Sequence, residues 1–180
     1  MSAKLPRRPS RLALALLALP ALLGADGGSR LEGQLVERDP TADQHAIDQG
    51  IERVVAEFPS LIRPLVRHYL GGVTGHCPEP GIAWDGPTLI YSCRGEELIR
   101  HVPDGVPFVW QIPDSDDTTT VRLEMPSPTT LSMSFSNDLG GRTQTFALQP
   151  DGTVTERIVY HSDKLPVPLE YTLVFERKAP

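Results

Sequence analysis

The chain has 180 residues, with 17 Lys and Arg against 23 Asp and Glu, which gives a formal net charge of −6 at pH 7. This acidic balance, without a basic cluster, argues against nucleic acid and against anionic membrane surfaces as partners, because phosphate binding depends on Lys and Arg. The length allows one domain with a substantial hydrophobic core.

Residues 1–25 have the layout of a secretory signal peptide. Four Lys and Arg residues precede an apolar run from Leu12 to Leu23, and small residues follow it. The run is short for a membrane span, which needs about 20 residues. We expect cleavage and a periplasmic or secreted protein without a stable membrane span; the alternative is a retained N-terminal anchor. Because residues 1–25 carry four positive and no acidic side chains, the net charge without them is −10.

The next segment is expected to lead into helices. Residues 26–40 are polar and Gly-rich, which indicates a flexible leader or an edge strand. Residues 41–72 predict a helical segment, since apolar residues recur at helical spacing on both sides of Pro59. Gly71 and Gly72 end this pattern. Each amphipathic helix has one apolar stripe to bury, so we expect another layer to cover both.

Residues 80–178 predict that second layer, an antiparallel sheet. Apolar and polar residues alternate there, as in residues 169–175, where every odd position is Leu, Tyr or Phe. The Pro-Asp-Gly sequence at 150–152 is a hairpin signal, because Pro presets φ and Gly accepts a positive φ. We predict one α+β domain over residues 41–180. Its N-terminal amphipathic helices precede an antiparallel meander of seven to nine strands that closes into a barrel or curls strongly.

Several turn and strand-end motifs resemble those of a protein family. They are Gly141-Arg142, the Pro-Asp-Gly hairpin, a Ser-x-x-Leu-Pro-x-Pro-Leu-x-Tyr run that starts at Ser162, and a closing Arg177. Over residues 139–177 the chain resembles uncharacterised exported bacterial proteins with an N-terminal helical segment and a lipocalin-like, or calycin-like, antiparallel β-barrel. The resemblance implies that fold, and with it the possibility of a small apolar ligand. The arginine and tyrosine that fatty-acid-binding barrels place two residues apart are missing.

The two cysteines, Cys77 and Cys93, predict a disulfide bond, because an exported protein meets an oxidising compartment. Such a bond closes a loop of about 16 residues and contributes roughly 3 kcal/mol in the chain-entropy model. A metal site that includes His76 would need a fourth ligand and lacks close C-x-x-C spacing. A reactive thiol would need electropositive surroundings, whereas this segment is rich in acidic residues.

The other polar residues form no recognisable catalytic motif. The sequence contains no H-E-x-x-H, G-x-S-x-G, P-loop or dinucleotide-binding motif. His161 and Ser162 are adjacent on a predicted strand and therefore point to opposite faces. We predict no catalytic residue, metal or cofactor. An enzyme remains the third hypothesis, and it requires His68, His101 or His161 to meet a carboxylate in a cleft.

The inner face of the sheet is the remaining candidate for function. Its aromatic and sulfur-containing residues form either a filled core or the lining of a cavity with an arginine at its rim. The first hypothesis is therefore an exported lipocalin-like domain that binds a small apolar or amphipathic ligand non-covalently. The second is an envelope accessory or interaction protein with a filled barrel. For the first, the candidate ligand-binding residues are Tyr91, Trp110, Met133, Arg142, Tyr171 and Arg177.

Overall fold

The computed structural model describes residues 31–113 and 115–178, so the expected signal peptide of residues 1–25 lies outside the described residues. The described chain contains two helices and ten strands. In chain order these are β1 (Gly33–Glu37), α1 (Pro40–Ala56), α2 (Arg63–Val73), β2 (Pro80–Asp85), β3 (Thr88–Cys93), β4 (Glu96–His101), β5 (Phe108–Gln111), β6 (Thr118–Ser127), β7 (Thr130–Asn137), β8 (Gly140–Leu148), β9 (Val154–His161) and β10 (Leu169–Arg177).

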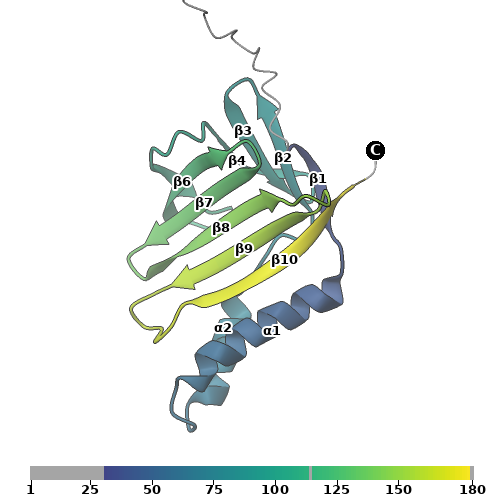
Figure 1. Ribbon diagram of the computed structural model, residues 1–180. Coiled ribbons are helices and arrows are strands. Elements are labelled where there is room, and N and C mark those ends of the chain that lie inside the picture. The colour runs from purple at the N-terminus through teal and green to yellow at the C-terminus, as the bar shows by residue number, and fades with distance from the viewer. Residues whose placement is uncertain (1–30, 114, 179–180) are drawn as a thin grey trace, which may run out of the picture.

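All ten strands belong to one antiparallel sheet, which curls around its inner face (Figure 1). Strands β2 to β4 and strands β5 to β10 each follow one another as a meander, and β1 joins the two series by lying between β10 and β2. Nine strands lie within the predicted range of residues 80–178; β1 is the tenth and makes the expected count of seven to nine too low. The expectation of a flexible leader or edge strand is likewise wrong for β1, because strands pair with both of its sides.

The two edge strands, β4 and β5, approach each other through side chains. Trp110 Nε1 of β5 donates a hydrogen bond of 2.8 Å to the Leu98 carbonyl oxygen of β4. The rings of His101 and Phe108 stack with their centroids 3.9 Å apart. The fold is therefore a strongly curled sheet whose edges are bridged by side chains.

Helix α1 covers the part of the β10 edge that β1 leaves unpaired, on the side of β10 away from β9. Asp39 caps the helix by accepting hydrogen bonds from the first free N–H groups, and Pro40 supplies a preset φ in the first turn. Strand β1 pairs with β10 only beyond residue 174. Before that point, Asp43 Oδ1 of α1 accepts a hydrogen bond of 3.1 Å from the Val174 N–H. Arg53 donates a hydrogen bond to the Glu170 carbonyl oxygen, so α1 covers this edge of β10 (Figure 1).

Helix α2 departs from the sequence expectation, because most of its apolar stripe is exposed. It buries Leu70 and packs on α1, where Arg67 forms an ion pair with Glu52. No layer among the described residues covers its outer side. The exposed apolar residues of α2 and the turn before it are Leu61, Ile62, Leu65, Tyr69 and Val73.

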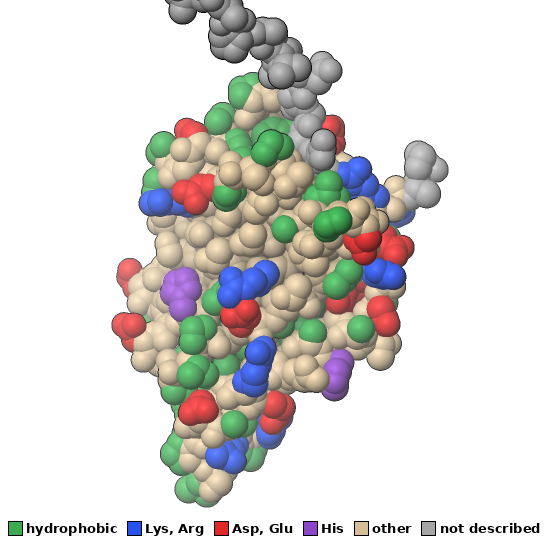
Figure 2. Space-filling view, in the orientation of Figure 1, with side chains coloured by type: hydrophobic (Ala, Val, Ile, Leu, Met, Phe, Trp, Pro, Cys, Tyr) green, Lys and Arg blue, Asp and Glu red, His purple; other side chains and the backbone are tan. Residues whose placement is uncertain are grey.

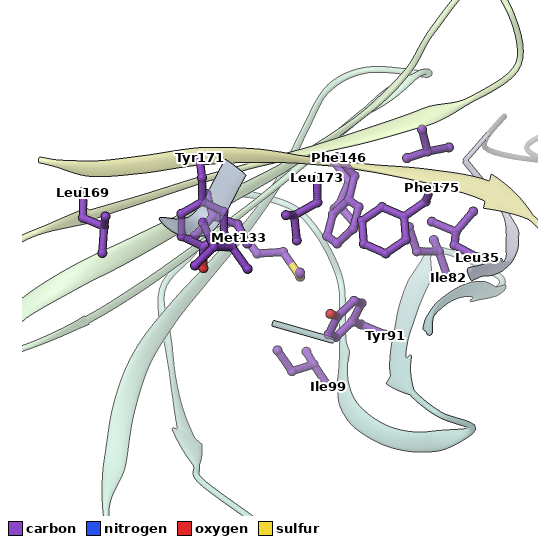
Figure 3. Close-up of a cluster of buried hydrophobic side chains, with 14 of the residues drawn as sticks. Leu35, Ile82, Tyr91, Ile99, Met133, Phe146, Leu169, Tyr171, Leu173 and Phe175 are labelled. Atoms are coloured by element: carbon purple, nitrogen blue, oxygen red, sulfur yellow. The ribbon is translucent and has the colours of Figure 1, made fainter. Parts of the chain in front are cut away.

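The inner face of the sheet forms a densely packed core together with α1. Figure 3 shows Tyr171, Leu173 and Phe175 of β10 pointing into the interior, with Tyr91 and Ile99 on the facing side. Phe146 and Phe175 have no exposed surface. The described residues contain no helix that is long and apolar enough to cross a membrane.

The predicted disulfide is confirmed. The Sγ atoms of Cys77 and Cys93 are 2.05 Å apart. The bond joins the segment after α2 to the end of β3, which is the junction between the helices and the meander. Neither cysteine is free to act as a thiol or as a metal ligand.

Candidate functional site

A pocket of about 260 Å³ remains inside the curled sheet. Its walls come from β3, β4, β5, β7 and β8 and from the linker between α2 and β2. The alternation of each strand sends every second side chain to this inner face. The lining residues are Gly75, His76, Cys77, Tyr91, Cys93, Leu98, Ile99, Trp110, Phe135, Arg142 and Gln144.

Aromatic and aliphatic side chains supply the apolar part of the lining. The rings of Trp110 and Phe135 meet edge to face, with centroids 6.1 Å apart. Tyr91 packs against Phe146 at 6.0 Å, and Ile99 is almost fully buried beside the pocket. Such surfaces bind ligands by the hydrophobic effect, at about 25 cal/mol for each Å² removed from water.

Arg142 places a positive charge at the pocket wall. Its guanidinium lies 4.7 Å from the centroid of the Phe135 ring and 5.9 Å from that of Tyr160. Its Nη1 donates a long hydrogen bond of 3.5 Å to the Gly75 carbonyl oxygen. Among the described residues no carboxylate forms an ion pair with Arg142. Cation–π contacts and the linker therefore hold the guanidinium in place.

A buried amide and a buried carboxyl lie beside one another behind this wall. Gln144 Nε2 donates a hydrogen bond of 2.6 Å to Glu156 Oε1. The amide oxygen Gln144 Oε1 and the second carboxyl oxygen Glu156 Oε2 are buried without a hydrogen-bond partner among the described residues. Burial raises the pKa of Glu156 to about 7, against the lowering effects of the Gln144 bond and the Arg142 charge.

Two tyrosines share this electrostatic environment. Burial, and then the negative charge of Glu156, raise the pKa of Tyr91 well above its ordinary value. Burial likewise raises the pKa of Tyr171, with further contributions from Tyr160 and Glu156. Both phenols therefore stay protonated over the physiological range and can donate hydrogen bonds.

Further carboxyl groups surround the start of α1. Glu37 contacts His76 Nε2, and both side chains are mostly buried. Burial raises the pKa of Asp43, which the hydrogen bond from Val174 opposes. Within residues 31–113 and 115–178 no group of three or more His, Cys, Asp or Glu side chains could hold a metal ion.

The structure brings three of the six sequence-predicted ligand residues together in the pocket: Tyr91, Trp110 and Arg142. Met133 and Tyr171 are buried in the core instead, outside the pocket lining. Arg177 is exposed at the end of β10, where the strand passes beyond the core.

The histidines named for the enzyme hypothesis do not meet carboxylates. Among the described residues, His68, His101 and His161 form no ion pair, and His101 contacts the neighbouring Val102 carbonyl oxygen instead. The histidine that meets a carboxylate is His76, with Glu37.

Sequence reasoning missed Gln144 and Glu156, the two most buried polar side chains of the barrel interior. The sequence does indicate both, because each lies at a strand position where the alternation otherwise places apolar residues. Gln144 is two residues from Phe146, and Glu156 lies between Val154 and Ile158. A polar residue at a core-facing position of a strand predicts a buried polar group that needs a hydrogen-bond partner.

A second hollow of about 800 Å³ lies outside the sheet, between α1 and β10. Most of its lining residues are of polar or charged types, including His45, Glu52, Arg53 and Glu170. Figure 2 shows acidic and basic side chains interspersed over the face of the molecule that it presents. We therefore place the candidate site in the interior pocket.

Comparison with known proteins finds similarity in structure only. No family model matches the chain, and no curated protein sequence matches it. One similar solved structure is a Schistosoma mansoni fatty acid binding protein in complex with arachidonic acid (TM-score 0.47, 13% identity, 84% of this chain and 98% of that chain covered). Another is the zebrafish ileal bile acid-binding protein complexed with cholic acid (TM-score 0.47, 9% identity, 83% and 100% covered).

Proposed function

We propose that this domain binds a small apolar or amphipathic molecule non-covalently in the interior pocket. One observation carries the proposal: a partly open pocket of about 260 Å³ adjoins the hydrophobic core at the inner face of the sheet. Its lining combines apolar and aromatic surface with a few polar groups, which is the usual composition of ligand sites.

The pocket geometry suggests how such a ligand would be held. Tyr91, Trp110 and Phe135 offer apolar surface, while Arg142 and Gln144 offer polar contacts. Typical ligand pockets measure about 300–1,000 Å³, so this pocket lies just below that range and suits a small molecule. Each buried methylene group contributes about 0.8 kcal/mol.

We also propose that the protein is exported to the periplasm or secreted. The residue pattern of 1–25 supports export. The Cys77–Cys93 disulfide supports an oxidising compartment, since such bonds are rare in reducing ones.

Titration with the neutral fluorescent probe N-phenyl-1-naphthylamine tests the binding proposal. In a Trp84→Phe variant, Trp110 is the only tryptophan. We expect saturable probe binding together with a change in Trp110 emission, because Trp110 lines the pocket.

A matched pair of variants locates the probe. Ile99→Phe adds volume beside the pocket and should weaken probe binding about tenfold. Val109→Phe makes a comparable change on the exposed face of β5 and should leave binding unchanged. Absence of saturable binding, or equal effects of the two variants, would contradict the proposal.

A second candidate function is that of an envelope interaction protein. The observation that favours it is the exposed apolar surface of α2, with Leu65 70% and Tyr69 65% exposed. Native mass spectrometry of the purified protein separates the candidates. A bound small molecule supports the first function, and a stoichiometric protein chain supports the second.

A further inference from the structure

The side-chain amide of Gln144 has a defined orientation in the pocket. Its Nε2 donates to Glu156 Oε1 at 2.6 Å, and an ionised carboxylate can only accept. The amide must therefore turn its NH₂ group toward Glu156 whenever Glu156 is ionised. Gln144 Oε1, the opposite side of the amide, is left without a partner among the described residues.

The pocket also offers a hydrogen-bond donor. Tyr91 lines it from β3, while Gln144 lines it from β8. The Tyr91 hydroxyl forms no hydrogen bond with other described residues, and its raised pKa keeps it protonated. A ligand group that both donates and accepts would satisfy Gln144 Oε1 and Tyr91 together.

The carboxyl groups around Glu156 disfavour a further carboxylate at this position, and the charge of Arg142 acts in the opposite direction. Asp43 and Glu37 act on Glu156 as like charges, and Arg142 opposes them. Glu37 already engages His76, whereas Arg142 is held against Phe135 and Tyr160. A ligand carboxylate would bring lone pairs to Gln144 Oε1 and a further negative charge to this interior.

We propose that Gln144, oriented by Glu156, selects a ligand hydroxyl group, so that the pocket binds neutral alcohols in preference to carboxylates. This inference rests on the proposed ligand-binding function and specifies its ligand class. Gln144 and Tyr91 are the contacting residues, and Glu156 is a positioning residue that acts through Gln144.

The selectivity should depend on pH. Burial raises the pKa of Glu156 to about 7, so this carboxyl is ionised above pH 7 and fixes the amide. Below pH 7 the protonated carboxyl can itself donate to Gln144, which frees the amide to turn. The groups that act on Glu156 are Gln144, Arg142, Asp43 and Glu37, and its charge in turn acts on Tyr91 and Tyr171. The preference for alcohols should therefore be larger at pH 8 than at pH 6.

Competition between 1-octanol and octanoate for bound N-phenyl-1-naphthylamine tests the inference. The two competitors have matched chains, and octanoate is ionised at both pH values. In the wild-type protein we expect 1-octanol to displace the probe at a concentration at least tenfold lower than octanoate at pH 8. The ratio should shrink at pH 6.

Variants assign this preference to residues. Gln144→Leu should weaken 1-octanol binding about tenfold and Tyr91→Phe severalfold, each relative to octanoate binding by the same variant, and circular dichroism checks that the variants fold. Gln44→Leu makes the same change on the exposed face of α1 and should have no effect. Glu156→Gln should make the ratio equal at pH 6 and pH 8, which loss of packing alone would not do.

The outcomes separate this inference from the function on which it rests. Probe binding with octanoate equal to or stronger than 1-octanol at pH 8 would overturn the inference and assign the polar contact to Arg142. An unchanged alcohol affinity in Gln144→Leu would also overturn it. Failure of the probe itself to bind would overturn the proposed function.

Discussion

Glu156 is a carboxyl group with no exposed surface and a single hydrogen bond. An ionised carboxylate in such surroundings costs several kcal/mol, which is why burial raises its pKa to about 7. Gln144 partly offsets this cost by donating to one oxygen. Perturbed carboxyl groups of this kind occur most often at functional sites, which agrees with the place of this pair beside the pocket.

The titration of Glu156 should make stability depend on pH. The folded state holds this proton more tightly than the unfolded chain, in which the pKa is about 4.5. The free energy of unfolding should therefore fall by about 3 kcal/mol as pH rises from 4.5 through 7. Glu156→Gln should remove this part of the slope, as measured by urea denaturation at pH 5 and pH 8.

In the comparison of wild type with Glu156→Gln, a second buried carboxyl group, Asp43, is present in both proteins. The pKa of Asp43 is also raised by burial, so a slope of the same sign should remain in the variant toward acid pH. An identical loss of stability in wild type and variant between pH 5 and pH 8 would show that Glu156 is not the group responsible.

At the scale of elements, α1 completes the sheet where β1 ends. Its contacts to β10 replace the hydrogen bonds that a neighbouring strand would make, through Asp43 and Arg53. The helix can lie this close because Gly50 faces β10: a Cβ at Gly50 would be 2.8 Å from the Glu170 carbonyl oxygen. Close packing here thus depends on the missing side chain.

Gly50→Ala should therefore destabilise the protein by about 1–3 kcal/mol, because the added methyl group displaces α1 from β10. Alanine itself is the better helix former, by about 1 kcal/mol. The matched control is Gly71→Ala in α2, where an added Cβ has no neighbour within 4 Å. That variant should be neutral or more stable. Equal shifts of the urea midpoint in the two variants would contradict the packing role of Gly50.

At the scale of the whole molecule, the sheet closes by two kinds of contact. Strand β1 joins β2 to β10 by backbone hydrogen bonds. The edges β4 and β5 meet only through side chains, with Trp110 donating to Leu98. Both of these residues line the pocket, so the pocket lies at the less tightly bonded side of the curled sheet.

The disulfide ties this side of the sheet to the helices. Replacing Cys77 and Cys93 together by serine should lower the free energy of unfolding by roughly 3 kcal/mol, since the bond closes a loop of about 16 residues. Chemical denaturation with and without a reductant measures the effect. The reductant should destabilise the wild type and leave the double variant unchanged. Native wild-type protein that reacts readily with a thiol reagent would contradict the bond.

Local features of the sequence determined much of this architecture. The alternation in residues 108–112 and 169–175 fixes which side chains enter the core, because the period of a strand is two. The Pro-Asp-Gly turn at 150–152 and the cysteine pair likewise act through short-range geometry and compartment chemistry. These signals predicted the antiparallel meander, the helices before it and the disulfide.

Only the tertiary structure decided the remaining features. The pairing of β1 with β10 joins residues far apart in the chain, and no local pattern specifies such a partner. The exposure of α2, the apposition of Gln144 and Glu156, and the volume of the pocket also depend on how distant elements pack. Periodicity determines which face a side chain occupies, whereas its neighbours across the core follow from the register and curl of the whole sheet.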